Sequence, residues 1–378
     1  MGITSAPSGP GKVSAMSADT GLSQDVRSLA INPNHWYVVA RADEVNNAPV
    51  GVMLWGQAIV LFRDAEGQIQ ALEDRCPHRQ VKLSQGEVNQ GELECVYHGW
   101  RFNAEGACTY IPYLTKHQQL PTCTIRVYPV QELAGFIWLY PGDLGVLEAD
   151  NIQPLGLPEW THLNYIATVS LIDVEAHYSF LIENLMDMYH GRLHDNYQAW
   201  ANPVLDHLET SAQRVNAYYK AQSYYRIDKI WSISQLFFPS LRQLHPEDLN
   251  VSYIYPHWVS TLGPDFKICC LFCPTGPTHT RAYLVHFTSL QAFDNLHKLP
   301  VPFRRWLKNR LFGSAQRMLD GIVQQDVVML EQEQAIYLQN PQRKGLELNR
   351  ALIGVQKLIR QQVVAATSPT PHRARAEL

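Results

Sequence analysis

The sequence predicts two folded units, a small all-β unit followed by a larger α+β unit. With 378 residues, the chain exceeds what a single hydrophobic core usually serves. The first part holds short β-type runs between turn residues, at 36–40, 58–62, 125–128 and 136–140. The second part mixes alternating β runs with helical patterns, which is typical of an antiparallel sheet with flanking helices.

The boundaries follow from where these patterns change. We place the β unit at residues 31–148 and the α+β unit at 149–365. In the second unit, β runs lie between 165 and 287, and helical patterns cover 174–197, 303–337 and 345–365. Residues 1–30 and 366–378 offer little to bury, so we expect them to be disordered tails.

Composition excludes several classes of protein. A net charge of -4 gives no general attraction for nucleic acid or anionic lipid. We expect a soluble protein, because no apolar window is long enough for a membrane helix. Seven cysteines, an odd count without an export signal, indicate a reducing compartment, and the cytoplasm is the expected location.

Two short pairs of metal-binding residues lie within the β unit. Cys76-Pro-His78 is followed by Cys95-Val-Tyr-His98, so each pair mixes a thiol and an imidazole. Zinc fingers place both Cys in one pair and both His in the other, although a structural zinc ribbon remains the alternative. Mixed pairs fit a [2Fe–2S] cluster in which one iron takes two thiolates and the other takes two imidazoles. The spacing therefore predicts an electron-accepting iron–sulfur site.

A second group of polar residues lies in the segment 183–194. Glu183, Asp187, His190 and His194 follow the spacing i, i+4, i+7, i+11, which lines them along one face of a helix. Two histidines at i and i+4 can reach one metal ion. One added carboxylate gives the facial triad that leaves positions of Fe(II) open for O2 and substrate. The alternative is a solvent-facing polar stripe.

These residues resemble a known family. Cys76-Pro-His78-Arg79, Cys95-Val-Tyr-His98-Gly-Trp100 and Trp138-Leu-Tyr-Pro-Gly142 are similar to the Rieske domain of ring-hydroxylating oxygenase α subunits, the Rieske-type non-haem iron oxygenases. The resemblance covers about residues 34–365. It implies a Rieske domain followed by a catalytic domain of helix-grip type, an antiparallel sheet around a long helix.

The resemblance also implies the roles of the site residues. The segment 183–194 is similar to the catalytic helix, where D-x2-H-x4-H is usual, whereas the gap between the two histidines here is three residues. Asp187 would bridge an iron-bound His and a cluster-bound His of a neighbouring subunit. The stretch from Gln325 to Glu331 is similar to a late acidic segment that supplies the third iron ligand, for which Asp326 is predicted and Asp320 and Glu331 are the rivals. The implied cofactors are a [2Fe–2S] cluster on Cys76, His78, Cys95 and His98, and Fe(II) on His190, His194 and Asp326.

The implied function is that of an oxygenase component. Electrons would come from NAD(P)H through a separate reductase or ferredoxin, since the chain holds no nucleotide-binding fingerprint. The chain length is similar to the homomeric branch, in which three subunits form a ring and hydroxylation or oxidative demethylation of small organic substrates is common. A cis-dihydroxylating dioxygenase is the alternative. From another class, the alternative is a Rieske electron carrier fused to a ligand-binding domain.

Other candidates carry weaker signals. Cys269, Cys270 and Cys273 lie in an alternating apolar run and are expected to be buried free thiols, and Cys108 and Cys123 have no spacing that suggests chemistry. A basic patch for an acidic electron donor is a further hypothesis. Its residues would be Arg79, Lys82, Arg101, Arg304, Arg305, Lys308, Arg310 and Arg317.

Overall fold

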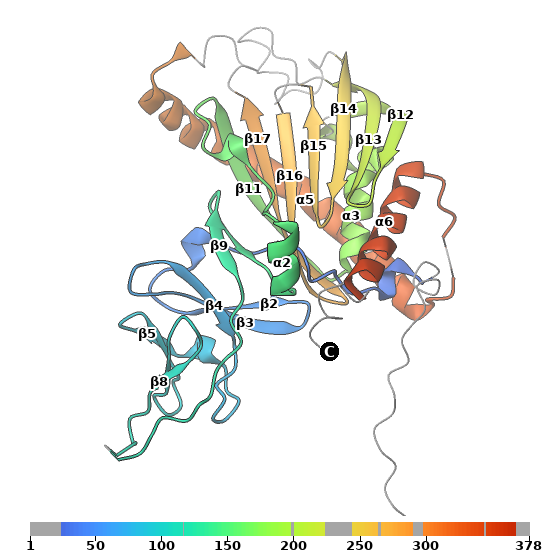
Figure 1. Cartoon of the computed structure of the whole chain (residues 1–378). Helices are drawn as coiled ribbons and strands as arrows, with labels where there is room; N and C mark the ends of the chain where they lie inside the picture. Colours follow the sequence, from blue (N-terminus) through green and yellow to red (C-terminus); the bar gives the residue numbers. More distant parts are fainter. Residues whose placement is uncertain are drawn as a thin grey trace, which may run out of the picture.

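The computed structural model describes residues 24–115, 117–197, 200–223, 244–263, 266–289, 298–343 and 345–367, leaving out the side chains of 195–197, 304–305 and 307–318. A β-rich unit lies beside a large sheet that is covered by helices (Figure 1). This arrangement confirms the predicted fold class, a small all-β domain joined to an α+β domain. Among the described residues, no helix is long and apolar enough to cross a membrane.

The β-rich unit is built from three small antiparallel sheets, ordered β1-β10-β9, β2-β3-β4 and β5-β6-β7-β8. Their strands are β1 Tyr37–Arg41, β2 Val50–Leu54, β3 Gln57–Arg63, β4 Ile69–Glu73, β5 Glu87–Asn89, β6 Glu92–Glu94, β7 Arg101–Phe102, β8 Cys108–Tyr110, β9 Val130–Leu133 and β10 Phe136–Leu139. Short 3-10 helices η2 Ala42–Glu44 and η3 Leu83–Gln85 connect them. The predicted run 125–128 forms only an isolated bridge, between Leu72 and Val127. Pro129 follows it and has no N–H to extend a ladder.

The second unit centres on a seven-stranded antiparallel sheet, ordered β11-β17-β16-β15-β14-β13-β12. Its strands are β11 Tyr165–Val174, β12 Trp200–Thr210, β13 Arg214–Ser223, β14 His245–Ile254, β15 His257–Leu262, β16 Phe266–Gly276 and β17 His279–Ser289. The sheet separates two hydrophobic cores, as the two faces of β17 show. Ala282 and Leu284 enter the core that also holds the helices, while Tyr283 and Val285 pack in a second core with Trp138 of β10.

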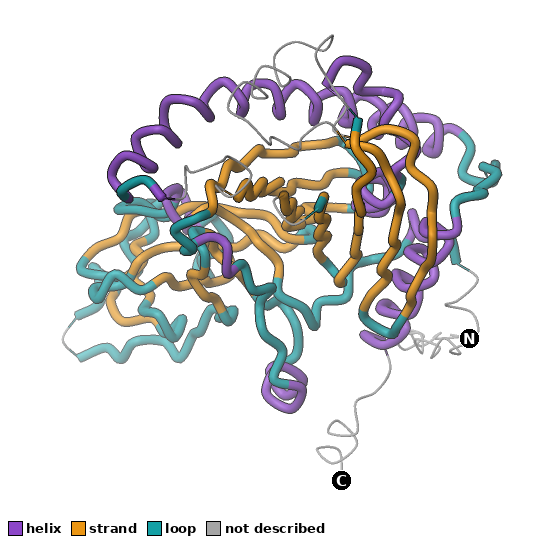
Figure 2. Tube along the Cα trace, turned by 90° about the horizontal axis from the view of Figure 1, so that it is seen from above, coloured by secondary structure: helices purple, strands orange, loops and turns teal. Residues whose placement is uncertain are grey.

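Helices lie on one face of this sheet, and α5 Val301–Gln339 is the longest, at 39 residues. Figure 2 shows a long helix running along the sheet. The side chains of Val323, Val327 and Leu330 are buried at helical spacing and join the main core. On the same face lie α3 Tyr178–Met186 and α6 Arg350–Thr367, with the 3-10 helices η1 Val26–Ser28 and η5 Met188–Tyr197. Helix α2 Leu144–Asp150 and the 3-10 helix η4 Pro158–Trp160 instead pack against the second core. A long helix held by an antiparallel sheet is the predicted helix-grip arrangement.

The segment predicted as one helix over 174–197 is broken at Asp187. Helix α3 ends at Met186, Asp187 has φ -90° and ψ 94°, and η5 follows as a 3-10 helix. The Asp187 carboxylate accepts the Tyr189 N–H at 3.1 Å. This local turn competes with continuation of the α-helix. The single stripe from residue 183 to 194 is therefore wrong, and the two histidines stand on η5 rather than on α3.

The N-terminal boundary also differs from the prediction. Residues 24–30 were expected within a disordered tail, but Val26 and Leu29 are buried in the main core. Arg27 pairs with Glu183 of α3 at 2.7 Å. Two buried apolar side chains and one ion pair attach this segment to the folded protein. The composition of residues 1–30 does not predict these contacts. Residues 1–23 and 368–378 lie outside the described residues.

Candidate metal centres

The two loops that carry the cysteine–histidine pairs share one backbone design. In the first loop, Cys76 N–H donates to Val81 O at 2.9 Å, and Gln80 N–H donates to Cys76 O at 2.8 Å. In the second, Cys95 N–H donates to Trp100 O at 2.8 Å, and Gly99 N–H donates to Cys95 O at 2.9 Å. The fifth residue of each loop is left-handed, with φ 63° at Gln80 and 67° at Gly99. Each loop thus turns back on its own cysteine.

These matched turns bring the four predicted cluster residues together. Cys76 and Cys95 are buried and belong to one core cluster, and the rings of His78 and His98 lie 4.6 Å apart. Burial, together with the neighbouring Cys95, raises the pKa of the Cys76 thiol to about 11. Nδ1 of His78 is buried and has no hydrogen-bond partner.

A buried nitrogen without a partner is costly unless a ligand completes it. Two thiols that metal binding would deprotonate and two adjacent imidazoles, one with a buried nitrogen that lacks a partner, are the donor set of a Rieske cluster. The residues present therefore fit the [2Fe–2S] group.

Trp100 covers the histidine side of this centre. Its ring stacks on His78 at 4.7 Å and an interplanar angle of 4°, and its Nε1–H donates to the Tyr113 hydroxyl at 2.7 Å. Tyr113, which holds the indole in place, carries no signal in the sequence.

The second centre lies where η5 meets α5. His190 and His194 stand on η5, and Asp326 reaches them from α5. Asp326 Oδ1 lies 3.8 Å from His190 Nε2 and 3.5 Å from His194 Nε2. The three ligand atoms all lie within 4.8 Å of one another, a separation that could hold one metal ion. The three-residue gap between the histidines is no obstacle, because the 3-10 helix brings their rings 5.2 Å apart.

Each histidine uses its other nitrogen inside the protein. Nδ1 of His190 contacts the backbone carbonyl of Asp187, and Nδ1 of His194 lies 3.1 Å from Gln325 Oε1. Both partners are oxygen acceptors, so the N–H sits on Nδ1, and the unprotonated Nε2, on the side of Asp326, keeps a lone pair for a metal ion. Two neutral imidazoles and one carboxylate are the ligand set of the facial triad, so these residues fit an Fe(II) ion.

The Asp187 carboxylate does not touch His190 in this structure. The carbonyl of Asp187 makes that contact, while its Oδ1 accepts from Tyr189 N–H and, at 3.0 Å, from Asn349 Nδ2. The expected carboxylate–imidazole hydrogen bond within the chain is thus replaced by a backbone contact.

The rival acids are accounted for elsewhere. Glu331 Oε1 accepts the Glu175 N–H at 3.2 Å, and among the described residues the metal-binding group contains neither Glu331 nor Asp320. Glu183 is buried beside Arg27, and burial raises its pKa despite that charge.

Three neighbours of the iron-type centre were missed by sequence reasoning. Asn184 Nδ2 donates to Asp326 Oδ1 at 3.3 Å, and Gln325 holds His194. The Trp200 ring lies 5.8 Å from His190 and 6.5 Å from His194. Asn184 and Gln325 lie within the segments that the sequence singles out, but their partners are distant in sequence, so no spacing identifies their roles.

Known proteins are similar to this chain over most of its length. The family profile of the Rieske [2Fe-2S] domain matches residues 35–129. The 4beta-methylsterol monooxygenase of Methylococcus capsulatus is 32% identical over 352 residues, which cover 89% of each chain. The chain belongs to the Rieske-type non-haem iron oxygenases. It is therefore an oxidoreductase of the class that combines a Rieske cluster with a mononuclear iron.

Other Rieske oxygenases match over shorter lengths or at lower identity. The vanillate O-demethylase oxygenase subunit of a Pseudomonas species is 37% identical over 160 residues, 42% of this chain and 43% of that one. The crystal structure of dicamba monooxygenase bound to 3,6-dichlorosalicylic acid has a TM-score of 0.70 at 20% identity, covering 90% of this chain and all of that one. The second likeness confirms the two-domain fold.

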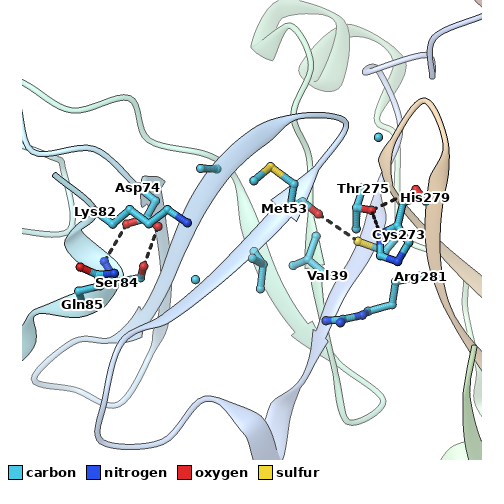
Figure 3. A pocket seen from close by; sticks show the side chains of 14 residues that line it. Val39, Met53, Asp74, Lys82, Ser84, Gln85, Cys273, Thr275, His279 and Arg281 are labelled. Carbon is cyan, nitrogen blue, oxygen red and sulfur yellow. Dashed lines mark hydrogen bonds between the residues drawn. The ribbon is translucent and has the colours of Figure 1, made fainter. Parts of the chain in front are cut away.

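A separate cavity of about 530 Å³ opens in this Rieske oxygenase between the β2–β3 hairpin and the turn from β16 to β17. Figure 3 shows its lining, in which Ser84 is hydrogen-bonded to Asp74 and Thr275 is hydrogen-bonded to His279. Arg281 also lines it and pairs with Asp173 at 2.9 Å. None of the residues of the two metal centres is among its lining, so we assign it to the domain junction rather than to the chemistry.

Two further predictions concern the cysteines at 269–273 and the basic patch. Cys269, Cys270 and Cys273 are buried free thiols of β16, as predicted. In the basic patch, Arg101 pairs with Glu94 at 2.6 Å, whereas the side chains of 304–305, 308, 310 and 317 lie outside the described residues.

Proposed function

We propose that this chain is the oxygenase component that hydroxylates or oxidatively demethylates a small organic substrate, using O2 and electrons from a separate reductase or ferredoxin. The observation that carries the proposal is the convergence of His190, His194 and Asp326 from two distant segments. A 2-His-1-carboxylate set leaves coordination positions for O2 and substrate. The methylsterol and methoxyl substrates named for the relatives suggest methyl groups as the point of attack.

The proposal assigns the four loop residues Cys76, His78, Cys95 and His98 to the [2Fe–2S] cluster, and His190, His194 and Asp326 to Fe(II). When bound, the two groups supply one-electron transfer and O2 activation. The protein contributes the fixed tautomers of the two histidines through the Asp187 carbonyl and Gln325. Asn184 donates to the ligand carboxylate and holds its orientation.

The proposed assembly is a ring of three subunits in which the cluster of one chain serves the iron of the next. The position of the centres within one chain supports it. The loops near β5 and β8 lie at the end of the β unit, on the opposite side of the molecule from α3 (Figure 1), and η5 follows directly on α3 along the chain. Asp187 would stand at the subunit boundary. We place the protein in the cytoplasm, and its seven free thiols are consistent with a reducing compartment.

The proposed domain limits are those of the sequence with an earlier start. The Rieske domain runs to about residue 148 and the catalytic domain from about 149 to 365, and the segment from residue 24 belongs to the folded part. Its contacts run to α3 and to α6 of the catalytic domain, through Arg27 and through the Arg360 side chain that bonds Gln24 O.

Metal content tests the assignment. The purified chain should hold about three irons and two acid-labile sulfides, one binuclear cluster plus one mononuclear site. His190→Ala and Asp326→Ala should each lose one iron and keep the cluster absorbance, while Glu331→Ala, a matched acid on the same helix, should lose none. About two irons in the unaltered chain would favour the electron carrier instead.

Substrate class is tested by reductant-dependent O2 consumption. Sterols carrying methyl groups, aromatic methyl ethers and unsubstituted aromatics form three arms. Formaldehyde release or a hydroxymethyl product supports monooxygenation, and a cis-diol from the third arm would support the dioxygenase alternative.

A further inference from the structure

Cys108 and Cys123 face each other across two antiparallel segments. Ala107 and Thr124 form an antiparallel bridge, and Cys108 N–H donates to Cys123 O at 3.4 Å. In this register residues 108 and 123 are direct cross-strand partners, and their side chains leave the ladder on the same face. The two thiols are hydrogen-bonding neighbours.

The pair lies against the Rieske core. Both cysteines are half-buried free thiols, and both pack on the core cluster that contains Cys76 and Cys95. Burial, and after it the adjacent Cys123, raise the pKa of Cys108 to about 12. The proposed cluster already uses two cysteines and two histidines, so this second pair of thiols has no part in it.

The residues between the two cysteines cover the histidine side of the cluster loops. A Cβ placed on Gly99 would lie 2.8 Å from Pro112 Cγ, which shows how closely this segment approaches the loop. Tyr113 accepts the Trp100 Nε1–H, and Trp100 stacks on His78. The paired thiols stand where the covering segment leaves and rejoins the domain.

We propose that Cys108 and Cys123 are a reversible redox pair whose disulfide joins the two ends of the covering segment, of which the structure describes residues 109–115 and 117–122. The oxidant is hydrogen peroxide. Two S–H bonds and the O–O bond break, one S–S bond forms, and two molecules of water are released. A dithiol reverses the step: its two S–H bonds and the S–S bond of the protein break, its own S–S bond forms, and both protons pass to the cysteine sulfurs.

Backbone geometry permits this bond without rearrangement. Disulfides join residues whose Cα atoms are about 4.4–6.8 Å apart. Directly opposed residues of an antiparallel pair are about 4.5 or 5.5 Å apart, within that range.

Trypsin separates the two cysteines cleanly, which makes the pair easy to follow. Arg101, Lys116 and Arg126 are the consecutive basic residues of this stretch, so peptide 102–116 carries Cys108 and peptide 117–126 carries Cys123. The cluster-loaded protein is treated with hydrogen peroxide, its thiols are blocked with N-ethylmaleimide in denaturant, and it is then digested.

We expect the two peptides to be joined after peroxide and separated by dithiothreitol, with loss of two of the seven alkylatable thiols and no loss of cluster absorbance. Cys108→Ser should abolish the joined peptide, while Cys269→Ser, a buried thiol of β16, should leave it unchanged. The proposal is overturned if both peptides remain alkylated, if each cysteine is oxidised singly to a sulfinic acid, or if the cluster absorbance disappears before the peptides join. None of these results depends on which substrate the oxygenase takes.

Discussion

Gln325 Oε1 lies 3.1 Å from His194 Nδ1, while the next residue, Asp326, faces Nε2 of the same ring at 3.5 Å. Two successive residues of α5 therefore face the two nitrogens of one imidazole, although Gln325 lies 131 positions after His194 in the sequence. The Gln325 amide oxygen keeps the His194 proton on Nδ1. This leaves Nε2 unprotonated, so that Nε2 and the Asp326 carboxylate can bind the same metal ion.

Replacing Gln325 should loosen the iron. In Gln325→Leu the His194 ring loses its acceptor, and we expect iron affinity to fall about 10- to 100-fold, the usual effect of removing such a partner. Gln325→Glu keeps an acceptor and should retain most of the affinity. Competition with a chelator measures the change, and Gln332→Leu, exposed on the same helix, is the control. Equal affinity in Gln325→Leu and the control would contradict this role.

Asp187→Asn should separate metal binding from electron transfer. An asparagine oxygen can still accept from Tyr189 N–H, so the turn into η5 and both metals should be retained. The negative charge proposed to bridge the subunits is lost, and we expect cluster reoxidation by O2 with substrate to slow by about 10-fold or more. Stopped-flow absorbance follows this step. Asn349→Ala removes a neighbour of the carboxylate but keeps its charge, and its rate should stay nearer the original.

Gly99→Ala should impair the cluster loop. A side chain at φ 67° costs about 1–2 kcal/mol, and its Cβ would lie 2.8 Å from Pro112 Cγ. Gly67 offers a matched control, because its φ is 77° and a Cβ added there would meet nothing within 4 Å. Both variants should lose stability in urea unfolding, but only Gly99→Ala should lose cluster absorbance. Full cluster content in Gly99→Ala would show that the Pro112 contact yields easily.

Arg27→Met should destabilise the catalytic domain. Its guanidinium pairs with Glu183, and both side chains are nearly covered, at 12% and 11% exposure. Leaving the carboxylate buried without its partner costs about 3–5 kcal/mol in such sites. Urea unfolding measures the loss, and the double variant Arg27→Met, Glu183→Met should recover part of it. Lys220→Met, which breaks an exposed pair with Asp248, should change little.

Stability should fall as the pH drops below about 6.5 because of buried histidines. Burial lowers the pKa of His257 to about 3 and of His177 and His286 to about 4. In the unfolded chain these rings take up protons near pH 6.5, whereas the folded protein keeps them neutral down to about pH 4. Stability is therefore complete above pH 6.5 and is lost through that window, by up to about 1.4 kcal/mol per pH unit for each ring.

Urea midpoints at pH 7, 6 and 5 test this expectation. His257→Gln should reduce the dependence of the urea midpoint on pH, because it removes one buried ring that protonates only in the unfolded chain. In the folded core, Nε2 of His257 bonds Trp36 O and its Nδ1 accepts from Phe272 N–H. His207→Gln, at an exposed ring, should leave the pH dependence of the midpoint unchanged. A urea midpoint that does not vary between pH 7 and 5 would contradict the prediction that these three histidines stay neutral in the folded protein.

Much of the cluster centre is determined by the sequence. Cys76, His78, Cys95 and His98 act through turns of a few residues, so their spacing alone predicts that they meet. The order of β and helical patterns likewise predicts two domains and a sheet around a helix. Local chemistry, repeated at short range, is what a linear pattern can express.

The iron-type centre depends on contacts that only the folded chain decides. Asp326 was chosen over Asp320 and Glu331 by resemblance, and the structure alone shows which of these acids α5 turns toward the two histidines. The break at Asp187, the grip of Gln325 on His194 and the opposition of Cys108 and Cys123 follow from packing between distant segments. Sequence spacing fixes which neighbours a residue has along one element. Which face meets another element is set by the burial of whole surfaces, and that requires the complete fold.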